Sequence, residues 1–270
     1  MARRGALHLV LALGAVLVAL PFAWELLTSF KTLPETAHVP PVLLPHVWRW
    51  DNYRTVFETV PFGRQMLNTV LMTAGRTFGQ LLFCSLAAFA FARLEFPFRN
   101  AIFLGFLSLT MVPAQLFLIP QYQIMASLGW LNSLQALIVP GMFSALGVFL
   151  LRQFFMRIPR ELDEAAKLDG CNPLQTYYYV VLPLAKPGLI ALGVLTTVWS
   201  WNDFLWPLIV NDDPDKMTLS AGLSALQGQY VTNYPVLMAG AVMATLPVIA
   251  VFVVLQRQFI AGIATTGSKG

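Results

Sequence analysis

Three long stretches without a charged side chain constrain this sequence more than any other feature. They hold 20 residues between Arg4 and Glu25, 52 between Arg99 and Arg152, and 40 between Lys216 and Arg257. A helix that crosses a bilayer needs about 20 predominantly apolar residues. The middle stretch is therefore long enough for two spans and the turn between them.

The composition supports a membrane environment. Apolar residues make up 57% of the 270 residues and charged residues only 11%, whereas a soluble domain carries about 25% charged residues. Lipid can solvate the apolar surface that such a chain leaves uncovered, provided that helices satisfy the backbone polar groups. We therefore predict an all-α membrane protein with the lipid bilayer as its surroundings and no nucleic-acid partner.

The apolar pattern predicts one transmembrane domain over residues 1–270 with six helical spans. We place them near 6–29, 65–92, 100–119, 132–152, 187–210 and 235–256. The first apolar run is longer than the roughly 7–15 residues of a signal peptide, and no small-x-small cleavage site follows. We expect it to be retained as a helix.

The lysines and arginines indicate how these spans are oriented. With both termini in the cytoplasm, eleven of the 17 Lys and Arg residues, from Arg3 to Lys269, lie inside, five lie outside, and Arg76 is intramembrane. The positive-inside rule favours this arrangement. It places the loop 153–186 in the cytoplasm and the proline-rich loop 30–64 outside. That outer loop is either a partner-binding cap or an interfacial loop anchored by tryptophans.

The residues that usually carry chemistry are sparse. Cys84 and Cys171 fall in a span and in a loop, which favours packing over redox pairing. The three histidines show no metal-ligand spacing, and no nucleophile constellation is present. The sequence therefore predicts neither a catalytic residue nor a metal site.

Residues 159–182 read as two short helices joined by a sharp turn. Gly170 is expected to end the first helix in a left-handed conformation. Asn172 and Pro173 are good first residues for the second, and Pro183 is expected to stop it. We expect one apolar face on the second helix, formed by Leu174, Tyr177, Tyr178 and Val181. Local physics leaves two roles open for this hairpin: docking of another protein, or capping of the helical bundle.

The spacing within this hairpin resembles the signature loop of the permease subunits of bacterial ABC importers. That pattern is Glu-Ala-Ala, three residues, Gly, nine residues, an aliphatic residue, one residue and Leu-Pro. The matching positions are Glu164, Ala165, Ala166, Gly170, Val180, Leu182 and Pro183. The resemblance implies that Glu164 contacts a polar surface of a separate ATPase subunit, that Ala165 and Ala166 pack in its cleft, and that Gly170 sets the turn.

The energy source is expected to lie on that partner. The sequence has no G-x-x-x-x-G-K-[ST] phosphate loop, so ATP and Mg would be bound by the ATPase, with no cofactor in this chain. The resemblance thus implies a non-catalytic subunit with a coupling hairpin between spans four and five, and alternating access driven by closure of the ATPase.

A second segment, 198–207, resembles the W-N-D-F-x-W-P run of carbohydrate permeases of the maltose/oligosaccharide type. Thr28-Ser29-Phe30-Lys31 and Ala244-Thr245-Leu246-Pro247 also fit that branch, so the resemblance covers nearly the whole chain. It implies a bacterial inner-membrane complex that imports a sugar or sugar derivative. The other members would be a homologous second permease subunit, two ATPase copies and an extracytoplasmic sugar-binding protein.

Two groups of polar residues are candidates for the substrate path. Thr73, Arg76 and Gln80 share one face of the second span, and Trp201, Asn202 and Asp203 lie in the fifth. An intramembrane charge normally faces protein or water. Arg76 either lines the path or forms a structural pair with Asp203 or Glu25. The tryptophan segment either contacts sugar, forms an interfacial belt or holds helices together.

Other functional classes remain possible at this point. An importer of the same type could carry a non-sugar solute. An ion-coupled secondary carrier would need buried titratable groups, for which Asp203 and Glu25 are the only candidates, and a membrane scaffold would leave the hairpin spacing unexplained.

Overall fold

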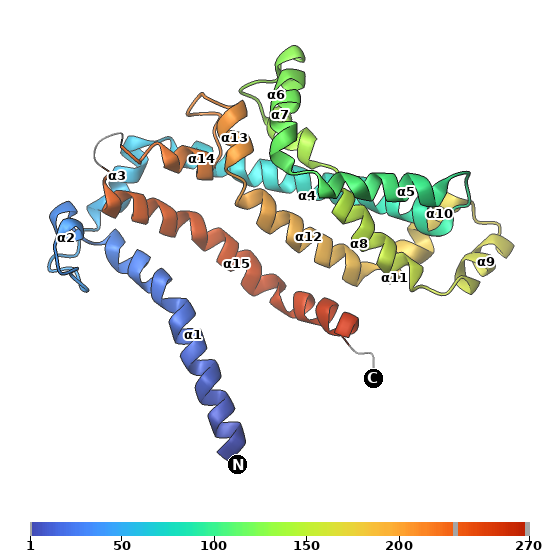
Figure 1. Cartoon of the computed structure of the whole chain (residues 1–270), viewed down its shortest axis with the longest axis horizontal. Helices are drawn as coiled ribbons and strands as arrows, with labels where there is room; N and C mark the ends of the chain where they lie inside the picture. Colours follow the sequence, from blue (N-terminus) through green and yellow to red (C-terminus); the bar gives the residue numbers. More distant parts are fainter. Residues whose placement is uncertain (1, 229–231, 268–270) are drawn as a thin grey trace.

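Helix α4 (Phe62–Arg93) is the central element of this computed structural model, which describes residues 2–228 and 232–267. The elements around it form an elongated bundle (Figure 1). In chain order they are α1 (Ala2–Ser29), α2 (Leu33–Ala37), α3 (Asp51–Thr59), α5 (Arg99–Ser108), η1 (Leu109–Met111), η2 (Ala114–Phe117), α6 (Leu118–Ser127), α7 (Leu134–Ile138), η3 (Val139–Gly141), α8 (Ala145–Met156), α9 (Glu161–Leu168), α10 (Pro173–Thr176), η4 (Tyr177–Val181), α11 (Leu182–Leu184), α12 (Lys186–Trp201), α13 (Leu205–Val210), α14 (Leu219–Ser224) and α15 (Tyr234–Gly267). Lys269, counted among the cytoplasmic charges, lies outside the described residues.

Three helices are long and apolar enough to cross a membrane unaided. They are Leu7–Ser29 within α1, the whole of α4, and Tyr234–Val251 within α15. Three bent pairs of helices reach the required length only together. By length and composition, the described residues therefore contain three candidate spans, or up to six if each pair counts as one. The predicted all-helical membrane fold is confirmed at this level.

The helices expected near 100–119, 132–152 and 187–210 are each interrupted. The first bends by 97° between Met111 and Ala114, and the second by 43° between Gly141 and Ala145. The fifth expected span ends its first helix at Trp201 and resumes at Leu205. Proline explains the sharpest bend, because the residue before a proline avoids the helical region and Val112, before Pro113, is extended.

The core gathers on α4. Helices α8 and α12 pack along it, and their buried residues form one cluster with Cys84, Val148 and Leu151 at 0% exposure. A second cluster joins α3, α14 and α15 around Val56, and a third joins α6, α7 and α13 to Met72 of α4. Helix α1, by contrast, packs along α15 and diverges from the bundle (Figure 1).

The two largest connecting segments lie at opposite ends of the molecule. Helices α2 and α3 of the loop 30–64 are at one end of the long axis, and α9 and α10 are at the other (Figure 1). The loop is folded on itself: the Phe30 ring contacts the rings of Trp48, Trp50 and Tyr53. The opposite placement fits the predicted assignment of the two segments to different membrane faces.

Candidate functional site

The hairpin between α8 and α12 has the predicted tight turn. Gly170 follows α9 with φ of 85°, a left-handed conformation that costs glycine little. The backbone N–H of Cys171 donates to the carbonyl of Ala166 at 2.9 Å, closing the end of α9. The Asn172 side chain then accepts from the Gln175 N–H at 2.9 Å, and the Gln175 side chain accepts from the Asn172 N–H at 2.8 Å. This reciprocal capping box starts α10, so the turn is held from both sides.

The second half of the hairpin ends within one residue of the predicted stop at Pro183. Its helix ends at Leu184, and the chain bends by 79° before α12. Before the proline the helix widens at η4, a five-residue π-helix in which the Leu182 N–H donates to the carbonyl of Tyr177. A proline in a helix has no N–H and its ring crowds the preceding turn. A wider turn directly before Pro183 relieves that crowding.

The matched hairpin residues divide between the surface and the interior. Glu164, Ala165, Gly170 and Pro183 are exposed, Leu182 is half-buried against the core, and Ala166 is buried within the chain. Ala166 therefore has little surface to offer a partner's cleft, unlike its neighbour Ala165.

The apolar face expected on the second hairpin helix is split. Tyr177 and Val181 are buried, and the Tyr177 hydroxyl bonds that of Ser85 in α4 at 2.7 Å. Leu174 and Tyr178 point away from the core and are 65% and 61% exposed. Because the hairpin turns one side of this helix to the bundle, only the other side is free. Leu168 and Tyr179 add to the exposed apolar surface.

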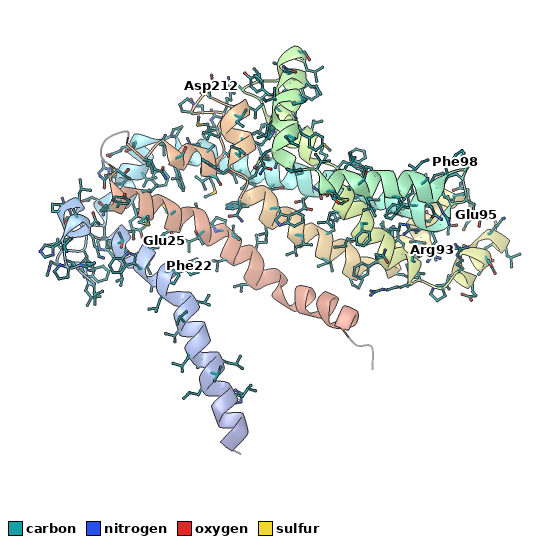
Figure 2. The ribbon with its side chains drawn as sticks, viewed as in Figure 1. Phe22, Glu25, Arg93, Glu95, Phe98 and Asp212 are labelled. Carbon is teal, nitrogen blue, oxygen red and sulfur yellow. The ribbon has the colours of Figure 1, made fainter. Side chains whose placement is uncertain are left out.

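Arg93, the last residue of α4, was not singled out by its spacing. Its Nη1 donates to Asp163 Oδ2 of α9 at 2.9 Å, and its Nη2 donates to the carbonyls of Phe155 and Ile158 at 2.5 and 2.6 Å. Figure 2 shows Arg93 at the end of the bundle beside the hairpin. Arg93 ends the run Ala88-Phe89-Ala90-Phe91-Ala92-Arg93, which also resembles the carbohydrate branch, and it is one of the predicted cytoplasmic charges. Neither feature indicates a partner for its side chain.

The polar stripe of α4 faces the interior of the chain. Thr69, Thr73, Arg76 and Gln80 are all buried. At the stripe's outer end, Asn68 donates to the carbonyls of Asp215 and Met217, both at 2.9 Å. The stripe thus holds together elements of this chain, and Thr73 Oγ1 is buried without a partner among the described residues.

Side chains of Trp206, Arg76 and Gln80 satisfy backbone carbonyls around the helix break at Pro140. Proline has no N–H to donate to the carbonyl four residues earlier. That carbonyl, on Ala136, accepts from Trp206 Nε1 at 2.9 Å. The next one, on Leu137, accepts from Arg76 Nε at 2.6 Å, and that of Gly141 accepts from Gln80 Nε2 at 2.9 Å. The stripe therefore stabilises an interrupted helix at membrane depth.

Arg76 also forms the ion pair that the sequence suggested. Its Nη1 lies 2.7 Å from Asp203 Oδ2, with side-chain exposures of 8% and 25%. Of the two candidate partners, the structure shows Asp203 and not Glu25. The other two residues of that segment are also bonded within the chain: Trp201 Nε1 donates to the carbonyl of Ala244, and Asn202 Nδ2 donates to that of Val198.

A cavity of about 280 Å³ lies where the three interrupted helices meet. Its wall includes Ala114 and Gln115 after the first break, Pro140 and Gly141 at the second, and Asp203 at the third. Arg76, Gln121 and Trp206 complete its polar lining. Non-helical backbone at membrane depth is tolerated where it lines a water-filled cavity or is buried in protein. Asp203 is the only acidic residue and Arg76 the only basic one, so their pairing leaves the wall without net charge.

Comparison with known proteins identifies the family. Residues 80–264 match the model of the binding-protein-dependent transport system inner membrane component. This chain belongs to that family. The predicted likeness to importer permeases is thereby confirmed, and the chain is a transport component of the inner membrane.

Relatives and solved structures extend over almost the whole chain. The sn-glycerol-3-phosphate transport system permease protein UgpE of Pectobacterium atrosepticum is 33% identical over 95% of this chain and 94% of its own length. The arabinooligosaccharides transport system permease protein AraQ of Halalkalibacterium halodurans is 34% identical over 95% and 93%. A crystal structure of a bacterial ABC transporter involved in the import of the acidic polysaccharide alginate has a TM-score of 0.82 and 24% identity, covering 94% of this chain and 95% of that one. This structural likeness shows the fold.

Proposed function

We propose that this chain is the pore-forming permease subunit of an ATP-driven importer for a sugar or sugar derivative. The complex would also contain a homologous second permease, two copies of an ATPase subunit and an extracytoplasmic sugar-binding protein. Family membership supports the importer, and it disfavours an ion-coupled carrier. The observation that carries the proposal is the exposed hairpin, with the importer motif on a turn fixed by Gly170 and the capping box of Asn172.

The hairpin surface suits docking of an ATPase. Glu164 and Ala165 are exposed on α9, and four large side chains with apolar surface are exposed around the turn, namely Leu168, Leu174, Tyr178 and Tyr179. Such a cluster marks an interaction site, and we assign it to a protein partner because the hairpin is predicted to lie in the cytoplasm. ATP and Mg would be held by that partner. Closure of the ATPases would drive alternating access through the hairpin.

Capture of the complex from native membranes tests this proposal. The chain is purified in mild detergent, and its companions are identified by mass spectrometry. We expect an ATPase subunit in the wild-type sample and its loss from Glu164→Ala and Gly170→Ala. Gly129→Ala is the matched control, because Gly129 also has positive φ with no atom near its missing Cβ, but lies beyond the hairpin. Stable assembly of the wild-type chain without any ATPase would contradict the proposal.

The substrate class rests on the cavity and on the relatives' names. The paired charges of Arg76 and Asp203 favour a ligand rich in hydroxyl groups over one that needs a free cation. Gln115 and Gln121 offer both donors and acceptors to hydroxyls. UgpE and AraQ are named for a glycerol phosphate and for oligosaccharides, which share a polyhydroxylated carbon chain. We propose that this cavity belongs to the translocation path of such a solute.

Gln121→Leu tests the path separately from assembly. Uptake of arabino-oligosaccharide and of sn-glycerol 3-phosphate is measured in proteoliposomes that contain the captured complex. Loss of one hydrogen bond to a hydroxyl is expected to raise the KM for uptake of the oligosaccharide about two- to tenfold. Gln123→Leu, on an exposed position of the same helix away from the cavity, is the control. Equal uptake kinetics in both variants would exclude the cavity from the path.

A further inference from the structure

One guanidinium joins three elements at the end of the bundle. Arg93 belongs to α4, Phe155 to the last turn of α8, and Asp163 to the first turn of α9. The Arg93 side chain is 4% exposed and that of Asp163 is 24% exposed. A charge-assisted hydrogen bond between such groups is shorter and stronger than a neutral one. Here it links the element that carries Glu164 and Ala165 to the central helix.

Few other contacts hold α9 to the bundle. Its packing is mainly against α10 and η4 of its own hairpin. In the described part of the chain, the Arg93–Asp163 pair is the only ion pair or side-chain hydrogen bond that ties α9 to α4. No second hydrogen bond could replace this one, because Arg93 Nε and Asp163 Oδ1 are both buried without a partner among those residues.

The central helix leads directly from this pair to the cavity. Arg76 lies 17 residues before Arg93 in the uninterrupted α4, a distance of roughly 26 Å at 1.5 Å per residue. A continuous helix shifts as a unit, whereas the interrupted spans can bend at their breaks. A displacement of α9 that is passed to Arg93 therefore reaches Arg76 and the walls of the cavity.

We propose that Arg93 is a positioning residue that couples α9, the first helix of the hairpin, to α4, with Asp163 as its partner. The Tyr177–Ser85 bond holds the second helix. The inference rests on the proposed docking of an ATPase to the hairpin, and assigns the step by which movement of that hairpin reaches the substrate path. Docking itself uses the exposed face of the hairpin. Loss of the pair therefore separates docking from transmission.

The test measures movement between the hairpin and α4 in the captured complex. Spin labels are placed on Cys171 and on Phe83→Cys, an exposed position of α4, while Cys84 is fully buried. Electron resonance gives the distance between them without nucleotide and after trapping with ATP and vanadate. In the wild type α9 and α4 move together, so the distance stays the same. In Asp163→Asn trapping shifts it by about 1–5 Å, the range of helix shifts in switching proteins.

Two further variants are compared with Asp163→Asn. Glu161→Gln removes an equal charge from an exposed position of the same turn and keeps the wild-type distances. Arg93→Lys keeps the charge but cannot reach the carboxylate and both carbonyls at once, so its shift is intermediate. We expect the complex captured with Asp163→Asn to contain as much ATPase as the complex captured with the wild type. Asparagine resembles aspartate in shape, and the two carbonyl contacts of Arg93 remain.

Three outcomes overturn the inference. Unchanged distances in Asp163→Asn would show that other contacts hold α9 to α4 and that Arg93 only caps α8. Loss of the ATPase from Asp163→Asn, with the ATPase retained by Glu161→Gln, would assign the pair to docking. Absence of an ATPase from the wild-type sample would overturn the proposed function together with this inference, and that result is visible before any variant is made.

Discussion

Helices α1 and α4 are both long enough to span a membrane, yet they are built for different surroundings. The best span window of α1 has a mean hydropathy of 2.2 and none of its residues buried, whereas that of α4 has 1.2 and 39% buried. The less apolar helix is thus the more deeply packed one. In water the apolar helix would be the buried one. Here lipid accepts apolar surface, and polar groups need protein partners.

This contrast shows which residues of a membrane-spanning helix predict its neighbours. Strong hydropathy identifies α1 as a span but says nothing of its neighbours. The polar residues of α4 identify its buried face, because Asn68, Arg76 and Gln80 meet acceptors on other elements. Polarity within a span therefore predicts internal contacts, and apolarity predicts lipid or another subunit.

The largest expected effect comes from the ion pair of α4. Arg76→Met leaves Asp203 without its partner and is expected to destabilise the chain by about 3–5 kcal/mol. The measurement is thermal unfolding in detergent. The double variant Arg76→Met with Asp203→Leu should recover much of this loss, since an apolar pair can replace a buried ion pair. If the single variant unfolds like the wild type, the pair is not structural.

Truncating one leucine to alanine in the cluster around α4 and one in α1 should give the next largest difference in stability. Leu151 of α8 is 0% exposed in the cluster around α4, and Leu17 of α1 is 71% exposed. Leu151→Ala is expected to cost about 2–5 kcal/mol through the cavity that it leaves. Leu17→Ala is expected to change the stability of the isolated chain by less than about 0.5 kcal/mol. Equal losses would remove the distinction between the two helices.

Glycine positions give a finer comparison. A Cβ on Gly141 would lie 2.5 Å from Arg76 Cδ and Nε, whereas one on Gly14 of α1 would meet nothing within 4 Å. Gly141→Ala is expected to cost about 1–3 kcal/mol by overpacking, and Gly14→Ala to be neutral or slightly stabilising. Both are followed by thermal unfolding. A neutral Gly141→Ala would mean that Arg76 has room to move.

The smallest effect concerns the loop that follows α1. Hydrogen bonds from the backbone N–H groups of Thr32 and His46 lower the pKa of Glu35 below its ordinary value of 4.5. The ionised carboxylate therefore stabilises the loop above that value, and the stabilisation is lost as the pH falls through the lowered pKa. The protection factor of the His46 N–H, which corrects its exchange rate for the intrinsic pH dependence, should fall over that range. Glu35→Gln should abolish the pH dependence, and a profile like that of the wild type would exclude Glu35 as its source.

The hairpin shows how much of a site sequence can predict. The left-handed Gly170 and the cap at Asn172 are confirmed, because both depend on local backbone preferences. The stop at Pro183 is confirmed to within one residue, whereas the π-helix directly before the proline was not predicted. The split of the expected apolar face also escaped prediction, since it depends on which side the fold turns toward α4.

The two ion pairs show which long-range contacts the sequence could predict and which it could not. Asp203 was one of two candidate partners for Arg76, and the short list came from the scarcity of intramembrane carboxylates. No such scarcity singled out Asp163 for Arg93, because charged residues are common at the aqueous ends of spans. The helix breaks were not predicted, although Pro113 and Pro140 lie at two of them and Pro207 lies in the first turn after the third.

The distance along the chain between Arg76 and Asp203 has a consequence for biogenesis. The two residues are 127 positions apart, so a ribosome making about 5–20 residues per second delivers the carboxylate roughly 6–25 s after the arginine. The Leu137 carbonyl arrives earlier, 61 positions after Arg76. During this interval the nascent α4 carries an arginine that water or the insertion machinery must solvate. Chains truncated before Asp203 would keep that arginine in α4 without its carboxylate partner.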